Sequence, residues 1–147
     1  MSGSVLIRLA NIDDAEQLFL LNLQFNGKDE TTLQHIQQSL KDNQQEIIAV
    51  AEVDHHLVGF LCIQLKRSFC YDACISEITE LFVQPEYRRK RIASNLILFI
   101  ETHCKETYTF TRIELLTGKK NRSAQGFYHA IDYMEDDELH LVKLFEV

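Results

Sequence analysis

The sequence lacks any run of roughly 20 apolar residues, the length that a membrane-spanning helix needs. Its first residues are a short apolar run followed by acids, so we expect no secretory signal. It also has no internal repeat, no low-complexity tract, no shift in composition and only one proline, Pro85. Nothing marks a linker, and the 147 residues predict one domain with its own core over residues 1–147. We expect a cytoplasmic protein without a membrane partner.

Cysteine is also scarce, with four residues in the chain: Cys62, Cys70, Cys74 and Cys104. No two of them have C-x-x-C spacing, and none has a neighbouring histidine at the spacing of metal ligands. We therefore expect no metal site. In a domain of this size inside a cell, such cysteines are typically reduced and mostly buried.

Positive charge is the minority sign, with 15 Lys and Arg against 22 Asp and Glu and a net charge of −7. A nucleic-acid-binding domain usually carries a basic face, so the balance argues against a nucleic-acid partner. Two explanations of the acidic surplus stay open. It serves solubility, or it matches a positively charged partner such as an amine.

Hydrophobic periodicity predicts strands and helices in the order β-α-α-β-β-β-α-β-α-β. This order indicates an α+β or mixed α/β fold with a central sheet flanked by helices. One helix is capped by Asn11, and another buries Ile92, Leu96, Ile100 and Cys104, which are each four residues apart. The strands are expected at 4–9, 47–53, 57–65, 75–83, 112–117 and 139–147, and the helices at 12–25, 30–40, from 92 onward and at 123–131.

The densest positive charge of the chain is the run Arg88, Arg89, Lys90 and Arg91, where a strand turns into a helix. The N-terminus of a helix is already positive, so cations there are unfavourable unless something negative offsets them. The free amides of a first helical turn, with added guanidinium groups, suit a diphosphate or larger polyphosphate. The alternative is a solvated basic turn or a short nuclear-localisation-like patch.

The residues around this run form a recognisable pattern. Residues 83–97, VQPEYRRKRIASNLI, resemble the acetyl-coenzyme A loop of the GNAT N-acetyltransferases, Arg/Gln-x-x-Gly-x-Gly/Ala after a strand that ends in Val-x-Pro. Arg88 matches the first position and Ala93 the last, whereas Arg91 and Arg89 stand where glycines are usual. With arginine in place of the middle glycine, we expect a negative φ at Arg91 and a side chain that points away from the phosphates or wraps them.

A second stretch, residues 121–128 (NRSAQGFY), resembles the family motif Asn-x-x-Ala-x-x-Phe-Tyr. Ile131-Asp132-Tyr133 follows where the family has a Leu-Gly-Phe helix stop, and aspartate is one of the few residues that tolerates a left-handed stop. The resemblance extends over most of the chain and agrees with the order of elements. It implies the GNAT fold, with a central mixed sheet.

The resemblance implies acetyl-coenzyme A as cosubstrate, with the pantetheine arm along the backbone of the strand before the loop. The residues that it assigns to the cofactor are Leu81, Phe82, Val83, Arg88, Arg89, Lys90, Arg91, Ile92, Ala93, Ser94, Asn121, Ser123 and Tyr128. Tyr128 matches a tyrosine near the thioester sulfur, where a phenol protonates the leaving thiolate. The alternative for this residue is a core aromatic beside Phe127.

Glu77 and Glu80 are the candidate bases, on the strand that leads into the loop. Residues three apart on a regular strand point to opposite faces, so only one is expected to face the acceptor unless a bulge intervenes. Both match positions where branches of the family carry an acid. We favour Glu80 because it lies nearer the expected thioester. The alternative for each is a solvated strand carboxylate.

The resulting hypothesis is an N-acetyltransferase that acts on a primary amine of a small cationic molecule or a peptide. The acceptor attacks directly, a carboxylate is the base and a tyrosine is the acid. A non-catalytic module with a degenerate loop, binding coenzyme A or a protein, is the alternative, because Arg89 and Arg91 replace glycines. Homodimers are usual for such folds.

Overall fold

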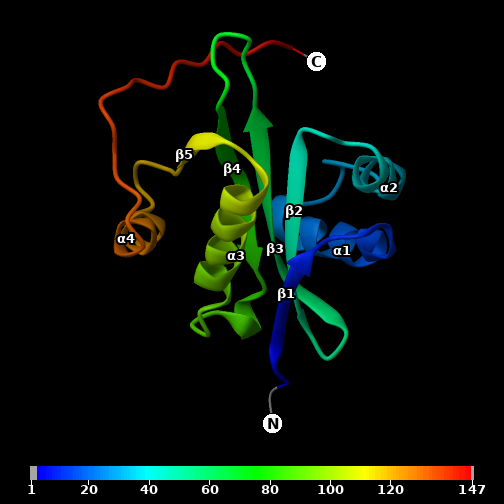
Figure 1. Ribbon diagram of the computed structural model, residues 1–147. Helices are drawn as coiled ribbons and strands as arrows, with labels where there is room; N and C mark the ends of the chain where they lie inside the picture. Colours follow the sequence, from blue (N-terminus) through cyan, green and yellow to red (C-terminus); the bar gives the residue numbers. More distant parts are fainter. Residues whose placement is uncertain (1–2, 147) are drawn as a thin grey trace. The chain divides into compact units, whose positions relative to one another are not determined.

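The computed structural model describes residues 3–146, and their contacts group into two units, one up to Leu116 and one from Thr117. The first contains the whole sheet and three helices, and the second contains one helix (Figure 1). Among the described residues, no helix is long and apolar enough to cross a bilayer.

The sheet has five strands, which are hydrogen-bonded in sequence order. Neighbouring strands are antiparallel except for the last two, which are parallel, so the sheet is mixed. The parallel pair needs a crossover connection, and a long helix supplies it. The strands are β1 (Val5–Leu9), β2 (Glu46–Val53), β3 (His56–Lys66), β4 (Cys74–Val83) and β5 (Phe110–Leu115).

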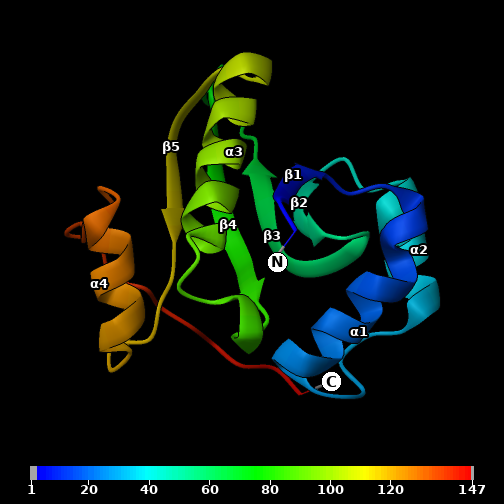
Figure 2. The same ribbon diagram turned by 90° about the horizontal axis from the view of Figure 1, so that it is seen from below.

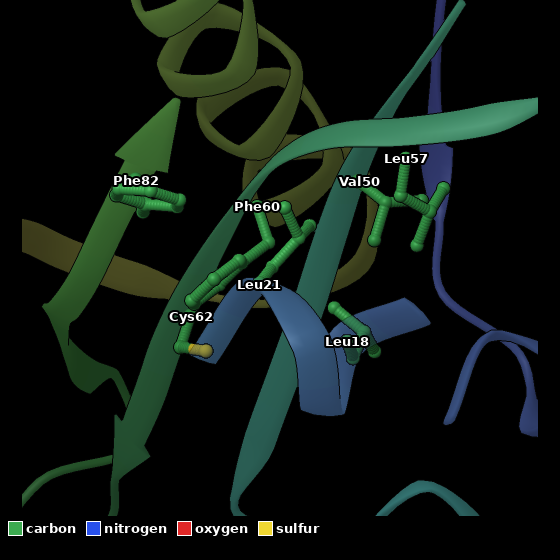
Figure 3. Close-up of a cluster of buried hydrophobic side chains, with 7 residues drawn as sticks. All are labelled: Leu18, Leu21, Val50, Leu57, Phe60, Cys62 and Phe82. Atoms are coloured by element: carbon green, nitrogen blue, oxygen red, sulfur yellow. The ribbon is translucent and has the colours of Figure 1, made fainter. Parts of the chain in front are cut away.

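Two helices cover one face of the sheet and a third covers the other (Figure 2). A 3₁₀ turn (Ile12–Asp14) leads into α1 (Ala15–Asn26), and α2 (Leu33–Lys41) follows. On the opposite face lies α3 (Ile92–Thr107). As predicted, the side chains of α3 that recur every four residues are buried. On the α1 face the core is a cluster of Leu18, Leu21, Val50, Leu57, Phe60, Cys62 and Phe82 (Figure 3).

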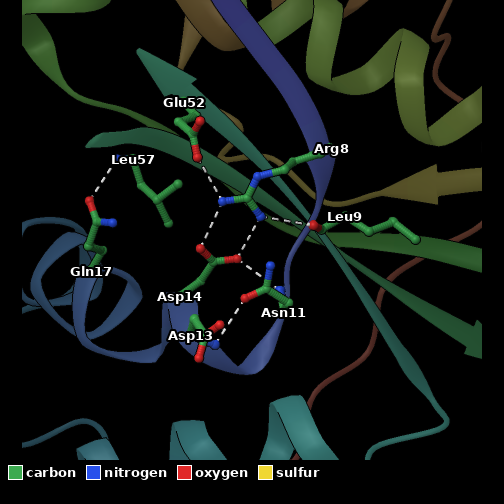
Figure 4. A network of polar contacts seen from close by, with 8 residues as sticks. All are labelled: Arg8, Leu9, Asn11, Asp13, Asp14, Gln17, Glu52 and Leu57. Carbon is green, nitrogen blue, oxygen red and sulfur yellow. Dashed lines mark hydrogen bonds and ion pairs between the residues drawn. The ribbon is translucent and has the colours of Figure 1, made fainter. Parts of the chain in front are cut away.

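The start of α1 is fixed by the polar network around Arg8 (Figure 4). Arg8 donates to both oxygens of the Asp14 carboxylate, at 2.8 and 2.9 Å, and to Glu52 Oε1 at 2.9 Å. The Asn11 amide donates to Asp14 Oδ2, and the Asn11 side chain accepts from Asp13 N, as in a capping box. The network ties β1, the first helix and β2 together, and it confirms the predicted cap.

The β2–β3 hairpin turns on two residues, Asp54 and His55, whose φ angles are 49° and 66°. A two-residue hairpin loop requires left-handed backbone, and Asp and His tolerate it better than most residues. Three of the cysteines are buried and all four are free, as the sequence predicts.

The second unit contains α4 (Arg122–Ala130), capped by the Asn121 side chain, which accepts from Ala124 N at 3.1 Å. The helix ends at Ala130, and the chain then reverses at Asp132, whose φ is 72°, while Tyr133 N donates back to Tyr128 O at 3.0 Å. The predicted left-handed stop at Asp132 is therefore confirmed.

The predicted strand at 139–147 is wrong for residues 139–146, which have no regular secondary structure, and Val147 lies outside the described residues. Alternating apolar residues suit a strand face, but a strand forms only where its backbone pairs with a neighbour. Within its own unit this segment has only a helix beside it in the chain, so the pattern finds no ladder to join.

Candidate cofactor and acceptor site

The last residues of β4 have a strand neighbour on one side only. Pairing of β3 with β4 continues to Val83, but pairing of β4 with β5 stops at Ile78 and Leu115. Among the described residues, the backbone groups of residues 79–83 that point toward β5 therefore have no strand partner. Leu81, Phe82 and Val83, the residues expected to bind the pantetheine arm, lie in this stretch. An extended amide-containing ligand can pair here as an additional strand does.

Arg88 fastens the loop that follows to the strand. Its Nε donates to the Val83 carbonyl at 2.9 Å, and its guanidinium lies 5.9 Å from the centroid of the Phe82 ring. The two Nη nitrogens have no partner among the described residues. Arg88 therefore holds the loop between β4 and α3 against the strand through Nε, and its two Nη nitrogens are available to donate hydrogen bonds to a ligand.

Arg89 and Arg91 both have left-handed backbone, with φ angles of 64° and 62°. The expectation of a negative φ at Arg91 is therefore wrong. The chain must reverse from β4 into α3 within a few residues, and the loop keeps the conformation that glycine favours without having the glycine. A Cβ in this conformation costs about 1–2 kcal/mol per residue.

The loop and the first turn of α3 present unused hydrogen-bond donors. The amides of residues 89–94 have no acceptor among the described residues, and the first amide of the helix with one is Asn95 N, which donates to Arg91 O at 3.0 Å. Arg89, Lys90 and Arg91 are exposed and have no carboxylate within ion-pair distance among residues 3–146. Free amides, the helix dipole and cations without a carboxylate partner are the features that suit an anion at a helix N-terminus.

The two candidate bases lie on the same face of β4 because a bulge separates them. The β3–β4 register shifts between Cys62 and Ile63, which leaves Thr79 as an extra residue on β4. Glu77 is opposite Gln64 and Glu80 is opposite Cys62, two residues along the same face of β3. Because Cys62 belongs to the α1-side cluster, both carboxylates face the α1–α2 layer.

Their charges are nevertheless handled differently. Lys66 Nζ lies 2.6 Å from Glu77 Oε1 and 3.1 Å from Glu114 Oε1, so Glu77 is neutralised by an ion pair. Glu80 has no ion pair among the described residues. Burial raises the pKa of Glu80, and a hydrogen bond with the Asn26 side chain offsets part of that rise. Of the two carboxylates, Glu80 is the one without an ion-pair partner among the described residues.

A further carboxylate that sequence reasoning missed, Glu46 on β2, belongs to the same face. Burial raises the pKa of Glu46, and the negative charge of Glu80 adds to the effect. Gln64 Nε2 donates to Glu46 Oε2 at 3.4 Å. Burial, with the charges of Glu46 and Glu80, also raises the pKa of the Cys62 thiol, so Cys62 is no thiolate nucleophile. Only the strand register could have revealed this grouping.

The family model described as the acetyltransferase (GNAT) family matches residues 12–133, most of the chain. The chain belongs to the GNAT family. The mixed five-strand sheet and four helices are the GNAT fold. A comparison with curated proteins finds no match.

Solved structures of the same fold include three that resemble this chain over nearly its whole length. An aminoglycoside acetyltransferase from an uncultured soil metagenomic sample, solved with sisomicin, is 19% identical, with a TM-score of 0.83 and 97% of each chain covered. The aminoglycoside N-acetyltransferase AAC(6')-Iy, solved with CoA, is 18% identical, with a TM-score of 0.83 and coverage of 98% of this chain and 96% of the other. The ribosomal-protein-alanine N-acetyltransferase of Brucella melitensis biovar Abortus 2308 is 19% identical, with a TM-score of 0.79 and coverage of 96% and 100%.

The residues of the second GNAT motif lie together on α4. Asn121 uses its side chain to cap the helix, Ser123 is exposed in the first turn and Tyr128 is half-buried. The Tyr128 ring packs against Phe127, with centroids 5.1 Å apart, and against Tyr133, with centroids 6.0 Å apart. Burial raises the pKa of the Tyr128 phenol, which keeps it protonated at neutral pH. The phenol therefore carries a proton at neutral pH, and the raised pKa makes it a weaker acid than an exposed tyrosine.

A cavity of about 500 Å³ lies at the other end of β4 and α3, away from the basic loop. The β3–β4 loop and the α3–β5 connection line it, with the Arg67 guanidinium 5.8 Å from the centroid of the Tyr108 ring. It contains none of the residues that the sequence assigns to the cofactor or to catalysis. Among residues 3–146, no group of three or more His, Cys, Asp and Glu is arranged to hold a metal.

Proposed function

We propose that this protein is an acetyl-CoA-dependent N-acetyltransferase that acetylates a primary amine of a small cationic molecule or a peptide. The observation that carries the proposal is the course of β4. The strand leaves β5 at Ile78 and continues to Val83, and it leads directly into a loop with free amides and uncompensated cations. An unpaired strand end beside an anion site suits a long carrier with amide groups at one end and a diphosphate at the other.

The proposed cofactor contacts follow from this arrangement. The amides of the pantetheine arm pair with the backbone of Leu81, Phe82 and Val83 on the side that β5 leaves open. The amides of residues 89–94 and the Nη groups of Arg88 hold the diphosphate, with a gain from the α3 dipole. A free backbone N–H of the strand polarises the thioester carbonyl and stabilises the oxyanion.

Glu80 is the proposed base for the acceptor. An amine arrives as an ammonium ion and must lose a proton before its nitrogen can attack. The Glu80 carboxylate takes that proton, directly or through water. The nitrogen attacks the thioester carbonyl to form a tetrahedral oxyanion, and the C–S bond breaks as this oxyanion collapses. The Tyr128 phenol gives its proton to the departing thiolate, and the new amide nitrogen gives its second proton to the Tyr128 phenolate or to water. The products are an amide and coenzyme A, and the Glu80 and Tyr128 protons exchange with solvent.

The charge of the α1–α2 face supports a cationic acceptor. Glu46 and Glu80 face this layer without an ion-pair partner among the described residues, and burial disfavours their charged forms. A bound ammonium group would stabilise these negative charges, and the carboxylates would in turn favour its binding. The structural neighbours named for aminoglycoside and ribosomal-protein-alanine acetylation are consistent with an amine acceptor.

The experiment couples binding to turnover. Calorimetry with acetyl-CoA measures binding, and a thiol-release assay over polyamines, aminoglycosides and lysine peptides measures transfer. Glu80→Gln is expected to lower kcat by about 10²–10⁴ with acetyl-CoA affinity unchanged. Glu77→Gln serves as the matched control, with a smaller loss because Lys66 already neutralises Glu77.

The second candidate is a coenzyme A-binding module without turnover, which the arginines at two glycine positions favour. Tight binding of acetyl-CoA with no thiol release on any amine would support this candidate. If Glu80→Gln and Glu77→Gln instead lower kcat by equal factors, Glu80 is not the base.

A further inference from the structure

We propose that the guanidinium groups of Arg89 and Arg91 bind the 3′-phosphate of coenzyme A, so that this protein selects the phosphorylated carrier over 3′-dephospho-CoA. This inference rests on the proposed function, since it assigns a further contact to the same cofactor.

Positive charge is concentrated in the loop where β4 turns into α3. Four cations stand in a row at a helix N-terminus that already carries about half a positive charge. A diphosphate diester carries about two negative charges, and the unused amides of residues 89–94 can donate hydrogen bonds to its oxygens without any side chain. A phosphomonoester adds about −1.5 to −2 at neutral pH. The whole carrier, unlike its diphosphate alone, matches the charge that the loop presents.

The four cations of this loop differ in their contacts. Arg88 is turned back to the Val83 carbonyl and the Phe82 ring. Lys90 Nζ lies 5.4 Å from the centroid of the Tyr87 ring, so the ammonium group makes a cation–π contact with the preceding turn. Arg89 and Arg91 have no hydrogen bond, ion pair or ring contact through their side chains among the described residues, and both are exposed.

The two guanidinium groups without contacts have the shape that suits a phosphate. A planar guanidinium fork binds phosphate oxygens with two parallel hydrogen bonds, which a lysine ammonium cannot do. Arg89 and Arg91 are separated by one residue and share the left-handed backbone, so two such forks project from one tight turn. Glycine at either position would keep the turn and remove the fork.

The test uses calorimetry with coenzyme A and 3′-dephospho-CoA on the full chain. Its variants are Arg89→Gly, Arg91→Gly and the double variant, since glycine suits a positive φ and retains the fold. The unaltered chain is expected to bind coenzyme A at least tenfold more tightly than 3′-dephospho-CoA, at about tenfold for each charge-assisted contact. The double variant is expected to bind the two carriers within about threefold of each other, with affinity for 3′-dephospho-CoA little changed.

Arg89→Lys and Arg91→Lys separate charge from geometry, because each keeps the charge without the fork and is expected to lose most of the preference. Lys90→Ala is the matched control and is expected to weaken both carriers by the same factor. Equal affinity of the unaltered chain for both carriers, or equal weakening of both in the double variant, overturns the inference alone. No binding of either carrier overturns the proposed function instead.

Discussion

The left-handed backbone at Arg91 predicts an unusual order of stability, in which glycine at this position is more stable than alanine. We consider Arg91→Gly and Arg91→Ala, which both delete the guanidinium and any repulsion from its basic neighbours. They differ in one respect, because alanine keeps a Cβ at a φ of 62° and glycine does not. The difference between the two variants therefore isolates the backbone conformation.

The magnitude follows from two opposing terms. Relief of the left-handed Cβ is worth about 1–2 kcal/mol. Glycine also gives the unfolded chain more conformational freedom, which costs about 0.5–1 kcal/mol relative to alanine. We therefore expect the free energy of unfolding of Arg91→Gly to exceed that of Arg91→Ala by about 0.5–1 kcal/mol. In a chain of this length, that is a rise in Tm of about 1–4 °C.

The assay is urea unfolding, with thermal unfolding as a second readout. Arg88 provides the matched control, because its φ is −74° in the same loop. Both Arg88 variants lose the hydrogen bond to Val83, but here glycine is expected to be less stable than alanine by about 0.5–1 kcal/mol. The order of glycine and alanine must therefore reverse between Arg88 and Arg91.

One result would refute the reasoning. If Arg91→Ala is as stable as Arg91→Gly while the Arg88 pair behaves as expected, the turn does not hold Arg91 at a positive φ. In that event the loop would have the negative φ that the sequence had first suggested, and the two free forks proposed for the 3′-phosphate would not share one turn.

Three further predictions concern the ionisable groups. Burial raises the pKa of Asp14, but the Arg8 hydrogen bonds, the Asn11 amide and the Arg8 charge outweigh it, so the net pKa is lowered. Asp14→Asn should therefore cost about 2 kcal/mol at neutral pH, and the difference should shrink as pH falls below about 4, where the stabilising ionisation is lost; urea unfolding across pH that shows a constant difference would contradict this. The raised pKa of Glu46 has the opposite sign, since its contribution is fully present below a pH of about 4 and is lost as pH rises through the folded pKa. Glu46→Gln should thus gain stability relative to the unaltered chain between pH 4 and 7, and a flat or falling difference in the same assay would argue against a raised pKa at Glu46. Tyr128→Phe should lower kcat by about tenfold or more with the KM for acetyl-CoA little changed, and steady-state kinetics that show an unchanged kcat would leave Tyr128 a packing residue.

The sequence by itself determined the features that depend on near neighbours along the chain. Asn11 caps its helix and Asp132 ends another because a cap is made by residues within one turn. The buried stripe of α3 follows from a spacing of four residues. The basic loop between β4 and α3 was recognisable because its motif is contiguous.

The tertiary structure decided what depends on the pairing of distant strands. Glu77 and Glu80 share a face only because a bulge at Thr79 shifts the register against β3, and only the sheet brings Lys66 to Glu77. Glu46 joins them from a strand about 30 residues earlier, where no local pattern announces it. The alternating residues 139–146 failed to become a strand for the same reason. The sequence determines the periodicity of side chains, whereas only the fold determines whether a strand has a neighbouring strand with which its backbone can pair.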